Sequence, residues 1–254
     1  MAYTISLANQ KGGVGKTTSA VNCAAALGAL DKRVLLVDLD PQGNATSGVG
    51  VQRKKIKLSS YDLIIGRAKA SEVIQSTGFK NLSVIPSQIS LAGAEFELID
   101  MDKRELLLKN ALDEVADDFD YIVIDCPPSL GILSINALAA SSGVIIPMQC
   151  EFYALEGLSQ LMLTIKQVKK LYNHSLEITG LLITMYNGRL NLSMQVLDEL
   201  KKYYADKLFK ASIVRNVKLS EAPSYGEPVI YYDKYSKGAK AYMDVAQEIV
   251  ERTL

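Results

Sequence analysis

The sequence predicts an α/β fold: a doubly wound, mostly parallel β-sheet with helices on both faces. Short apolar runs of four to six residues alternate with longer segments of helical periodicity, the pattern of parallel strands joined by helical crossovers. A glycine-rich loop follows the first apolar run and precedes a helix. No linker rich in Gly, Ser or Pro divides the chain, so we expect a single domain over residues 1–254.

The elements can be placed in order from these runs. YTISLA predicts a strand over 3–8, the Ala-rich stretch after the glycine loop a helix over about 17–30, and RVLLV a strand over 33–37. The next strands are expected at 81–85 and 121–124, with a helical stretch at 103–118 between them. Prolines and glycines divide the uncharged segment 126–150 into a turn, a helix and a strand at 143–147. Helices at about 155–171, 191–204 and 237–252 and strands at 178–184 and 210–214 complete the prediction.

The composition is that of a globular protein without an extreme charge. The 254 residues are 48% hydrophobic and 22% charged, and 28 basic side chains balance 28 acidic ones. A strongly basic nucleic-acid binder is excluded for the chain as a whole, although a local basic patch is not. The three cysteines are too scattered for a disulfide framework or a CxxC metal site. Since neither a secretory signal nor a spanning helix is expected, we predict a cytoplasmic protein.

The most informative segment is the glycine loop NQKGGVGKTT over residues 9–18. Its glycines let successive backbone N–H groups turn toward an anion, and the positive end of the next helix faces the same point. Lys16 is placed to reach the β- and γ-phosphates of a nucleotide, and Thr17 offers a hydroxyl to Mg²⁺. We therefore predict that ATP and Mg²⁺ bind here. The nucleotide-binding residues expected are Lys11, Gly12, Gly13, Val14, Gly15, Lys16, Thr17 and Thr18.

The start of the loop differs from the common phosphate-loop pattern. That pattern, G-x-x-x-x-G-K-[ST], requires a glycine where the sequence has Gln10, and a second lysine, Lys11, follows. In this the loop resembles the deviant Walker A group, K-G-G-x-G-K-[ST]-[ST], which it matches throughout. The resemblance implies that Lys11 reaches across a dimer to the nucleotide of the partner subunit. Lys11 and Lys16 are then both expected to neutralise charge in the transition state.

Three aspartates follow predicted strands, at the edge of the sheet where doubly wound folds bind ligands. Asp38 and Asp40 come after the run RVLLV, and one of them is suited to orient the water that attacks the γ-phosphate. Asp125 ends the run YIVI, which is the form of a Walker B strand whose carboxylate holds Mg²⁺ directly or through water. Thr17 and Asp125 are therefore the predicted magnesium site.

Together these segments resemble one family over nearly the whole chain. ANQKGGVGKTT, RVLLVDLDPQGNATSGVG, YIVIDCPPSLG and LSEAPSYG look like the Soj/ParA chromosome- and plasmid-partitioning ATPases. The resemblance implies a slow ATPase that forms an ATP-bound sandwich dimer and is stimulated by a centromere-binding partner of the ParB class. It also implies that Asp40 supports hydrolysis and that Val214 and Asn216 lie near the nucleotide. The family commonly has proline at the position of Val214.

A basic segment offers a place for DNA on a chain of zero net charge. Between residues 189 and 218 there are seven basic and three acidic side chains. Doubled in a dimer, such a patch can neutralise several phosphates without reading bases. The resemblance implies nonspecific binding of double-stranded DNA through Arg189 and Lys218, and hence association with the nucleoid. Charge alone also fits ordinary solvated helix faces. The shorter basic run over residues 53–57 is a weaker candidate for DNA binding, and it also fits an exposed loop.

Two other classes of protein share such a loop. A membrane-targeted division regulator resembling MinD needs a basic amphipathic helix at its C-terminus, whereas the last helix here carries glutamates. A reductase resembling the nitrogenase iron protein needs a pair of cluster-ligating cysteines, and neither Cys126 nor Cys150 is placed as such a ligand. We therefore predict a partitioning ATPase that does not bind membranes.

Overall fold

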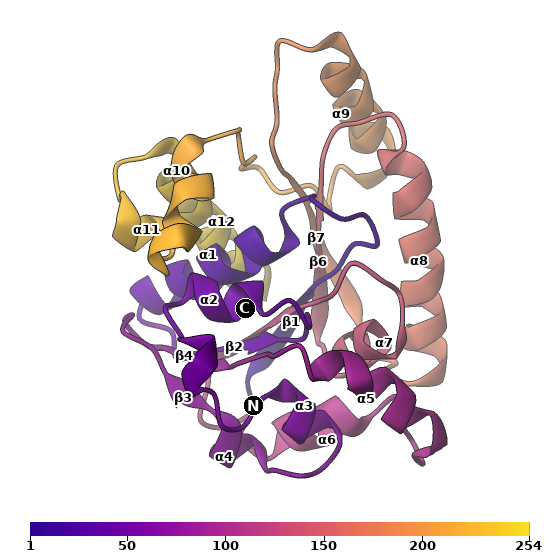
Figure 1. Ribbon diagram of the computed structural model, residues 1–254. Helices are drawn as coiled ribbons and strands as arrows, with labels where there is room; N and C mark the ends of the chain where they lie inside the picture. The colour runs from indigo at the N-terminus through magenta and orange to yellow at the C-terminus, as the bar shows by residue number, and fades with distance from the viewer. Residues whose placement is uncertain (254) are drawn as a thin grey trace.

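The computed structural model describes residues 1–253, which contain one seven-stranded sheet (Figure 1). Its strands are β1 (Tyr3–Leu7), β2 (Val34–Asp38), β3 (Gln75–Ser76), β4 (Leu82–Ile85), β5 (Tyr121–Asp125), β6 (Gly143–Met148) and β7 (Glu177–Ile183). They lie in the order β3-β4-β2-β5-β1-β6-β7, and every neighbouring pair is parallel except β3 with β4. The predicted doubly wound, mostly parallel sheet is confirmed.

Helices cover both faces of this sheet (Figure 1). The α-helices are α1 (Lys16–Ala29), α2 (Asn44–Gly48), α3 (Ser60–Ile64), α4 (Ala70–Val73), α5 (Leu91–Glu97), α6 (Leu107–Asp113), α7 (Ile132–Ala139), α8 (Ala154–Leu171), α9 (Asn191–Tyr204), α10 (Val217–Glu221), α11 (Val229–Tyr232) and α12 (Lys237–Thr253). Short 3-10 helices span Arg53–Lys55, Leu98–Asp100 and Ala222–Tyr225.

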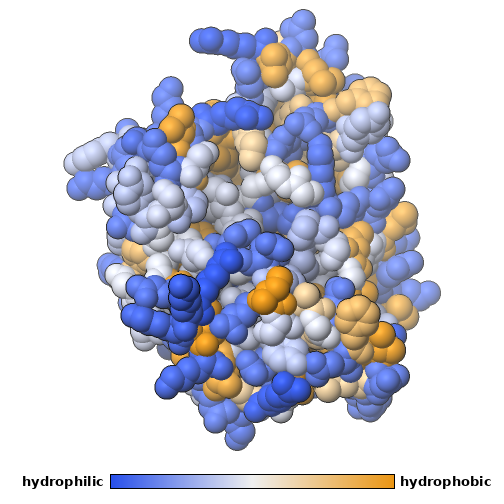
Figure 2. All heavy atoms as spheres, viewed as in Figure 1, coloured by the Kyte–Doolittle hydropathy of each residue, from blue (hydrophilic) through white to orange (hydrophobic). Residues whose placement is uncertain are grey.

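The outer surface is mostly hydrophilic on the face that Figure 2 shows, with hydrophobic residues set singly or in small groups among polar ones. Scattered apolar residues are normal for a protein surface. Among residues 1–253 no helix combines the length and the apolar character that a membrane crossing requires.

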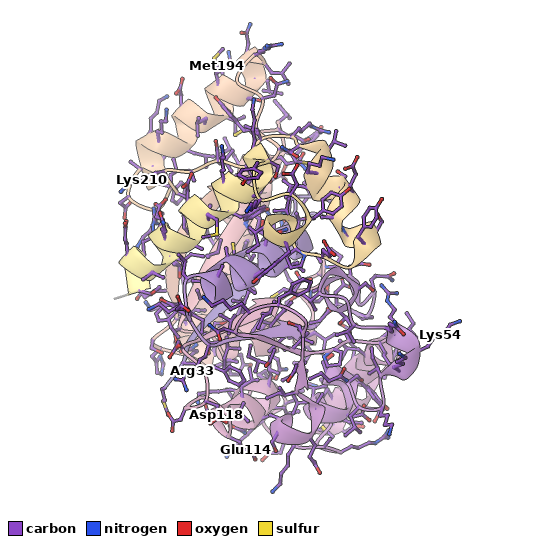
Figure 3. All side chains as sticks on the ribbon, turned by 90° about the vertical axis from the view of Figure 1, so that its left-hand side faces the viewer. Arg33, Lys54, Glu114, Asp118, Met194 and Lys210 are labelled. Carbon is purple, nitrogen blue, oxygen red and sulfur yellow. The ribbon has the colours of Figure 1, made fainter. Side chains whose placement is uncertain are left out.

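Helix α12 packs against α1, the helix that follows the glycine loop (Figure 3). The Tyr242 hydroxyl, which is fully buried, lies 3.0 Å from the hydroxyl of Ser19. At the far end of α12, the Arg252 guanidinium donates to the carbonyl oxygens of Thr179 (2.7 Å) and Leu208 (2.5 Å). These bonds tie the last described helix to β7 and to the segment beyond α9.

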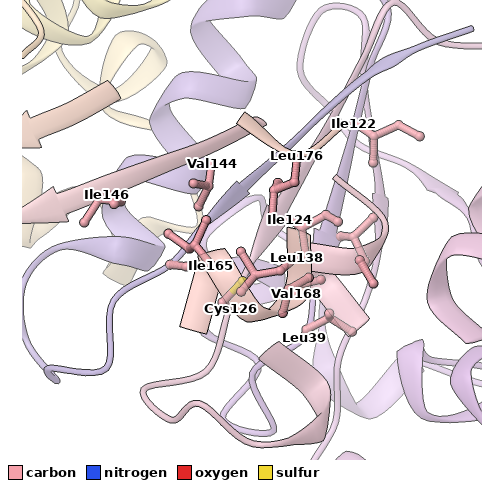
Figure 4. Close-up of a cluster of buried hydrophobic side chains, with 14 of the residues drawn as sticks. Leu39, Ile122, Ile124, Cys126, Leu138, Val144, Ile146, Ile165, Val168 and Leu176 are labelled. Atoms are coloured by element: carbon pink, nitrogen blue, oxygen red, sulfur yellow. The ribbon is translucent and has the colours of Figure 1, made fainter. Parts of the chain in front are cut away.

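Two large apolar clusters fill the space between the sheet and its helices, one on each face. Successive side chains of a strand point to opposite faces, so Leu35 and Val37 of β2 join one cluster and Leu36 joins the other. The first cluster packs β2, β5 and β6 against α7 and α8 (Figure 4). Each fully buried Leu or Ile contributes roughly 1.5–3 kcal/mol. The carboxyl ends of the strands are thereby held in fixed positions.

Two predicted elements are wrong. The strand expected at 210–214 does not form, because the chain there makes only isolated bridges: Leu208 pairs with Leu181 of β7, and Val214 pairs with Tyr186, beyond the end of β7. The helix expected at 103–118 is present only as α6, since turns precede it and Lys103 has a φ of +50°. The short helices α2, α3 and α4 were not predicted, as four or five residues show no helical period.

Candidate phosphate loop and magnesium site

The glycine loop lies between the end of β1 and the first turn of α1, as predicted. Gly13 and Gly15 have φ values of +73° and +85°, which side-chain-bearing residues rarely adopt. A Cβ atom on Gly12 or Gly13 would meet nothing within 4 Å, so the space in front of the loop is open. Gly12, Gly13, Gly15, Lys16, Thr17 and Thr18 line a cavity of about 320 Å³ together with Asp40, Asn44, Pro128 and Met185.

Two carbonyl groups of the loop accept hydrogen bonds from side chains that the sequence did not indicate. Gln149 Nε2 donates to the carbonyl oxygen of Gly13 (2.8 Å), and Thr184 Oγ1 donates to that of Val14 (2.7 Å). These bonds fix the loop backbone, whose N–H groups can bind an anion. Gln149 and Thr184 follow β6 and β7 directly. The sequence signal that could have identified Gln149 and Thr184 is therefore a polar residue directly after a predicted parallel strand.

Lys16 is the cation at the centre of the site. It is buried, with 6% of its surface exposed, and its ammonium donates to the carbonyl oxygen of Lys11 at 3.0 Å. Burial lowers the pKa of Lys16, and the nearby charge of Asp125 opposes that decrease. A lysine held by a single neutral acceptor can exchange that bond for phosphate oxygens.

Two buried carboxylates lie side by side behind the loop. Asp38 and Asp125 are paired in register at the carboxyl ends of β2 and β5, and neither is exposed. Asp38 accepts hydrogen bonds from the Thr46 N–H (2.8 Å), the Thr46 hydroxyl (2.7 Å) and the Asp40 N–H (3.1 Å). Burial raises the pKa of Asp38 to about 6 despite these bonds. Asp38 thus holds the chain around Asp40 in place.

Asp125 is the unsatisfied member of the pair. Both its carboxylate oxygens are buried and lack a hydrogen-bond partner among residues 1–253. Burial, and next the charge of Asp38, raise the pKa of Asp125 well above its usual range, while Thr17 and Lys16 oppose the rise. A buried carboxylate without a partner is costly, and a cation offsets that cost.

The residues present fit a magnesium ion. The orphan carboxylate of Asp125 and the Thr17 hydroxyl are hard oxygen ligands of the kind that Mg²⁺ prefers. No group of three or more His, Cys, Asp or Glu side chains suited to a metal occurs among the described residues. Mg²⁺ is usually bound by one or two protein carboxylates together with water and phosphate oxygens.

Asp40 differs from Asp38 in where its carboxylate lies. Its side chain lines the cavity in front of the loop, and its Oδ1 accepts a bond from the Gln42 N–H at 2.9 Å. The sequence left open which of the two aspartates could orient water. Because Asp38 is engaged in holding the backbone, Asp40 is the one available to a ligand in the cavity.

Lys11 is not part of this cavity. Its ammonium forms an ion pair with Glu151 of the same chain, and its side chain is 42% exposed. The neighbouring Gln10 Nε2 donates to Gln160 Oε1 on α8 at 2.8 Å. The two signature lysines therefore have different positions, Lys16 inside the site and Lys11 on the surface beside it.

A second cavity, of about 410 Å³, adjoins the loop on the side of α12. Val214 and Asn216 both line it, beside Gly15 and Thr18 of the loop, so the structure brings the two predicted residues next to the phosphate loop. Asn216 Oδ1 accepts from the Lys218 N–H (2.8 Å), which leaves the amide N–H₂ group for a ligand. The remaining lining residues are Thr184, Met185, Ile213, Arg215, Val217, Leu219, Ser220 and Tyr242.

Arg189 and Lys218, the predicted DNA contacts, lie on different elements. Arg189 is in the turn after β7, where its N–H donates to Asn187 Oδ1 and its guanidinium has no ion-pair partner within residues 1–253. Lys218, on α10, pairs with Glu221 at 2.9 Å and lies over the Tyr232 ring. No contact recorded for the described part of the chain joins the two.

The cysteines offer no cluster ligands. Cys23, Cys126 and Cys150 are all free and buried. Burial raises the pKa of Cys126 strongly and that of Cys150 to about 11, so both side chains are neutral thiols at physiological pH.

Comparison with known proteins places the chain in a family. Residues 2–178 match the family model described as an AAA domain. The sporulation initiation inhibitor protein Soj of Bacillus subtilis is 54% identical over 249 residues, which are 98% of each chain. The chain belongs to the Soj/ParA family of partitioning ATPases.

One further relative and one solved structure are also similar to the chain. The chromosome partitioning protein ParA of Myxococcus xanthus is 48% identical over 248 residues, 98% of this chain and 88% of that protein. The crystal structure of cobyrinic acid a,c-diamide synthase from Mycobacterium smegmatis with bound ADP and magnesium is 37% identical. It has a TM-score of 0.86 and coverage of 100% of this chain and 96% of that chain. This Soj/ParA-family chain therefore shares its fold along its whole length with a protein that holds ADP and magnesium.

Proposed function

We propose that the protein is an ATP-dependent DNA-partitioning ATPase that acts as one domain over residues 1–254. Two subunits would enclose two ATP molecules between them, and this dimer would bind double-stranded DNA nonspecifically. Hydrolysis, stimulated by a ParB-type centromere-binding partner, would release it, so the active protein would be associated with the nucleoid. The observation that carries the proposal is the pair of lysines on one glycine loop, one in the cavity and one held outside it.

The site residues would divide the chemistry among them. The loop N–H groups and Lys16 would bind the phosphates, while Thr17 and Asp125 would hold Mg²⁺. When bound, Mg²⁺ would supply positive charge that offsets the negative charge of the phosphates. Asp40, fixed by the Gln42 and Asp38 bonds, would orient the attacking water. The base would enter the cavity lined by Val214 and Asn216.

The position of Lys11 supports the dimer. Its ion pair with Glu151 is exposed, with 42% and 47% of the two side chains accessible. Exposed ion pairs contribute only about 0–1 kcal/mol. Lys11 can therefore leave Glu151 at little cost when a partner's phosphates approach. Its neutralising charge would reach the second nucleotide only in the dimer.

DNA binding would follow from dimerisation. Within residues 1–253 the Arg189 guanidinium has no ion-pair partner, and Lys218 pairs with Glu221. Phosphate contacts of this kind position a protein on DNA without reading sequence, and their number doubles when two subunits associate. A single subunit with zero net charge would bind weakly.

The test compares DNA binding with ATP, with ADP and without nucleotide, on two unrelated duplexes of equal length. We expect binding only with ATP, little difference between the duplexes, and a steep loss of affinity between about 50 and 200 mM salt. Arg189→Glu should keep ATP binding and dimerisation but lose DNA binding. Lys166→Glu, a charge reversal at an exposed position of α8, should bind DNA normally. A flat salt response, a strong preference for one duplex, or equal behaviour of the two variants would contradict the proposal.

A further inference from the structure

A third cavity, of about 410 Å³, lies beside the chain that follows Asp40 and shares no residue with the phosphate-loop cavity. Two cations, two glutamines and two serines line it, and no carboxylate does. The complete lining is Pro41, Gln42, Arg53, Lys54, Ser87, Gln88, Ile89 and Ser90. In a protein with as many acidic as basic side chains, a cavity with donors and cations but no acid is selective for an anion.

Ser87 supplies the observation that points to a ligand. The residue is fully buried, and its hydroxyl has no hydrogen-bond partner among residues 1–253. Its backbone N–H is already used, since it donates to the Thr46 hydroxyl at 2.8 Å. A buried hydroxyl without a partner is unfavourable unless a ligand or water bonds to it. Ser87 is one of the residues that line the cavity, so a buried hydroxyl without a partner belongs to its wall.

Arg53 and Lys54 supply the positive charge. Arg53 is held in place, because its Nε donates to the Ser47 hydroxyl (2.9 Å) and its Nη2 to the carbonyl oxygen of Gly43 (3.1 Å). Neither cation forms an ion pair within the described residues. Lys54 extends from the surface into solvent (Figure 3), so its ammonium is free to turn onto a bound anion.

We propose that this cavity is a binding site for a small phosphate-bearing ligand, a phosphate monoester or diphosphate. The phosphate oxygens accept from the Ser87 hydroxyl and the Gln42 amide and lie between Arg53 and Lys54. The sequence offered the basic run over residues 53–57 only as a weaker DNA contact, and the fold places one of its lysines, Lys54, at this cavity.

The site is connected to the residue that would orient water. Gln42 lines the cavity, and its N–H donates to Asp40 Oδ1 at 2.9 Å. From the other wall, the Ser87 N–H donates to the Thr46 hydroxyl, which donates to Asp38 at 2.7 Å. A ligand that orders this segment changes the position of Asp40, so its occupancy regulates turnover. This second step rests on the proposed ATPase function, whereas binding of the phosphate does not.

The binding test uses isothermal titration calorimetry of the whole protein with inorganic phosphate and pyrophosphate. The phosphate loop is first saturated with a non-hydrolysable ATP analogue and Mg²⁺, so that any further binding occurs elsewhere. Lys54→Glu should weaken phosphate binding by about tenfold or more, because it removes a charge-assisted bond and adds repulsion. Lys55→Glu is the matched control, since Lys55 is an exposed neighbour that does not line the cavity, and it should stay within about twofold.

Ser87→Ala separates binding from folding. Removal of an unpartnered buried hydroxyl should leave the thermal midpoint unchanged or raised, yet weaken phosphate binding by about fivefold. Absence of a second binding isotherm, or equal effects of Lys54→Glu and Lys55→Glu, overturns the proposal. The proposal is also overturned if the protein binds a short DNA duplex in a Lys54-dependent way but does not bind phosphate, because the cavity would then be a DNA contact. Failure of the ATP analogue to bind would instead count against the proposed function.

Discussion

Asp38 and Asp125 have the same chemistry and the same burial, yet their hydrogen bonding separates their roles. Asp38 accepts three bonds and fixes the backbone near Asp40, whereas neither oxygen of Asp125 is used. The sequence could predict that both lie at one edge of the sheet. It could not show which has a free carboxylate, because that depends on Thr46, whose hydroxyl reaches Asp38 from a helix that was not predicted.

The stability of the nucleotide-free protein should depend on pH through Asp38. Its folded pKa of about 6 lies above the unfolded value of about 3.9. The folded state thus binds the Asp38 proton more tightly than the unfolded state does. This proton adds fully to the stability below about pH 4, and its contribution is lost as the pH rises through 6. The free energy of unfolding, measured with urea, should fall between about pH 4.5 and 7.5. The fall should be smaller in Asp38→Asn than in the parent, by on the order of 2 kcal/mol. Parallel profiles for the two proteins would contradict this.

Asp40→Ala should separate nucleotide binding from hydrolysis. Its carboxylate lines the cavity but contributes no bond that holds the loop, so ATP should still bind and the dimer should accumulate. Turnover should fall by at least about a hundredfold, the usual contribution of a group that assists proton transfer from water. Light scattering with saturating ATP and a phosphate-release assay measure the two quantities. A variant that stays monomeric, or that hydrolyses ATP at the parental rate, argues against this role.

At the scale of elements, the phosphate loop depends on residues that lie far from it in sequence. β1, the loop and α1 are local and were predicted from one segment. The bonds that orient the loop come from Gln149 and Thr184, at the ends of β6 and β7, on the side of the sheet next to β1. The wrong strand predicted at 210–214 lies at this end of the sheet too. One side of β7 pairs with β6, whereas on the other side the chain beyond α9 forms only two isolated bridges, at β7 and just beyond its end.

Gln149→Leu should weaken ATP binding by about fivefold, because the Gly13 carbonyl loses its donor and the loop is less well ordered for the anion. The matched control is Gln160→Leu, which removes an exposed bond to Gln10 at the outer side of the loop and should have little effect. Calorimetry with ATP and Mg²⁺ measures both affinities. Equal losses in the two variants would show that the Gly13 bond has no particular importance.

For the whole molecule, the sequence predicted the layered architecture and most of the site, and the errors have a common physical cause. Strands and long helices show their period over many residues, and the carboxyl ends of parallel strands meet at one edge, so Thr17, Asp40 and Asp125 could be placed together. The cavity beside Ser87, by contrast, is enclosed by loops and a 3-10 helix without a period. Long-range contacts among such segments leave no local pattern.

Gly12→Val should prevent dimerisation without unfolding the subunit. A Cβ at Gly12 meets nothing within 4 Å, so valine fits the isolated chain, but it occupies the open space in which a partner's loop would approach. ATP binding should remain within about tenfold of the parent. Gly78→Val is the control, because Gly78 is equally open in a loop away from the site. Light scattering with ATP should show a monomer for the first and a dimer for the second; two dimers would contradict the expected contact.

The contact between α1 and α12 also sets an order of events during protein synthesis. Ser19 and Tyr242 are 223 residues apart, and Tyr242 forms part of the wall beside the glycine loop. A ribosome that adds about 5–20 residues per second needs roughly 10–45 s to cover that distance. During that time the nascent chain contains the complete glycine loop but lacks Tyr242, so the cavity beside the loop is incomplete. Translation products interrupted before Tyr242 are therefore expected to hold a nucleotide less firmly, because the cavity beside the loop lacks part of its wall.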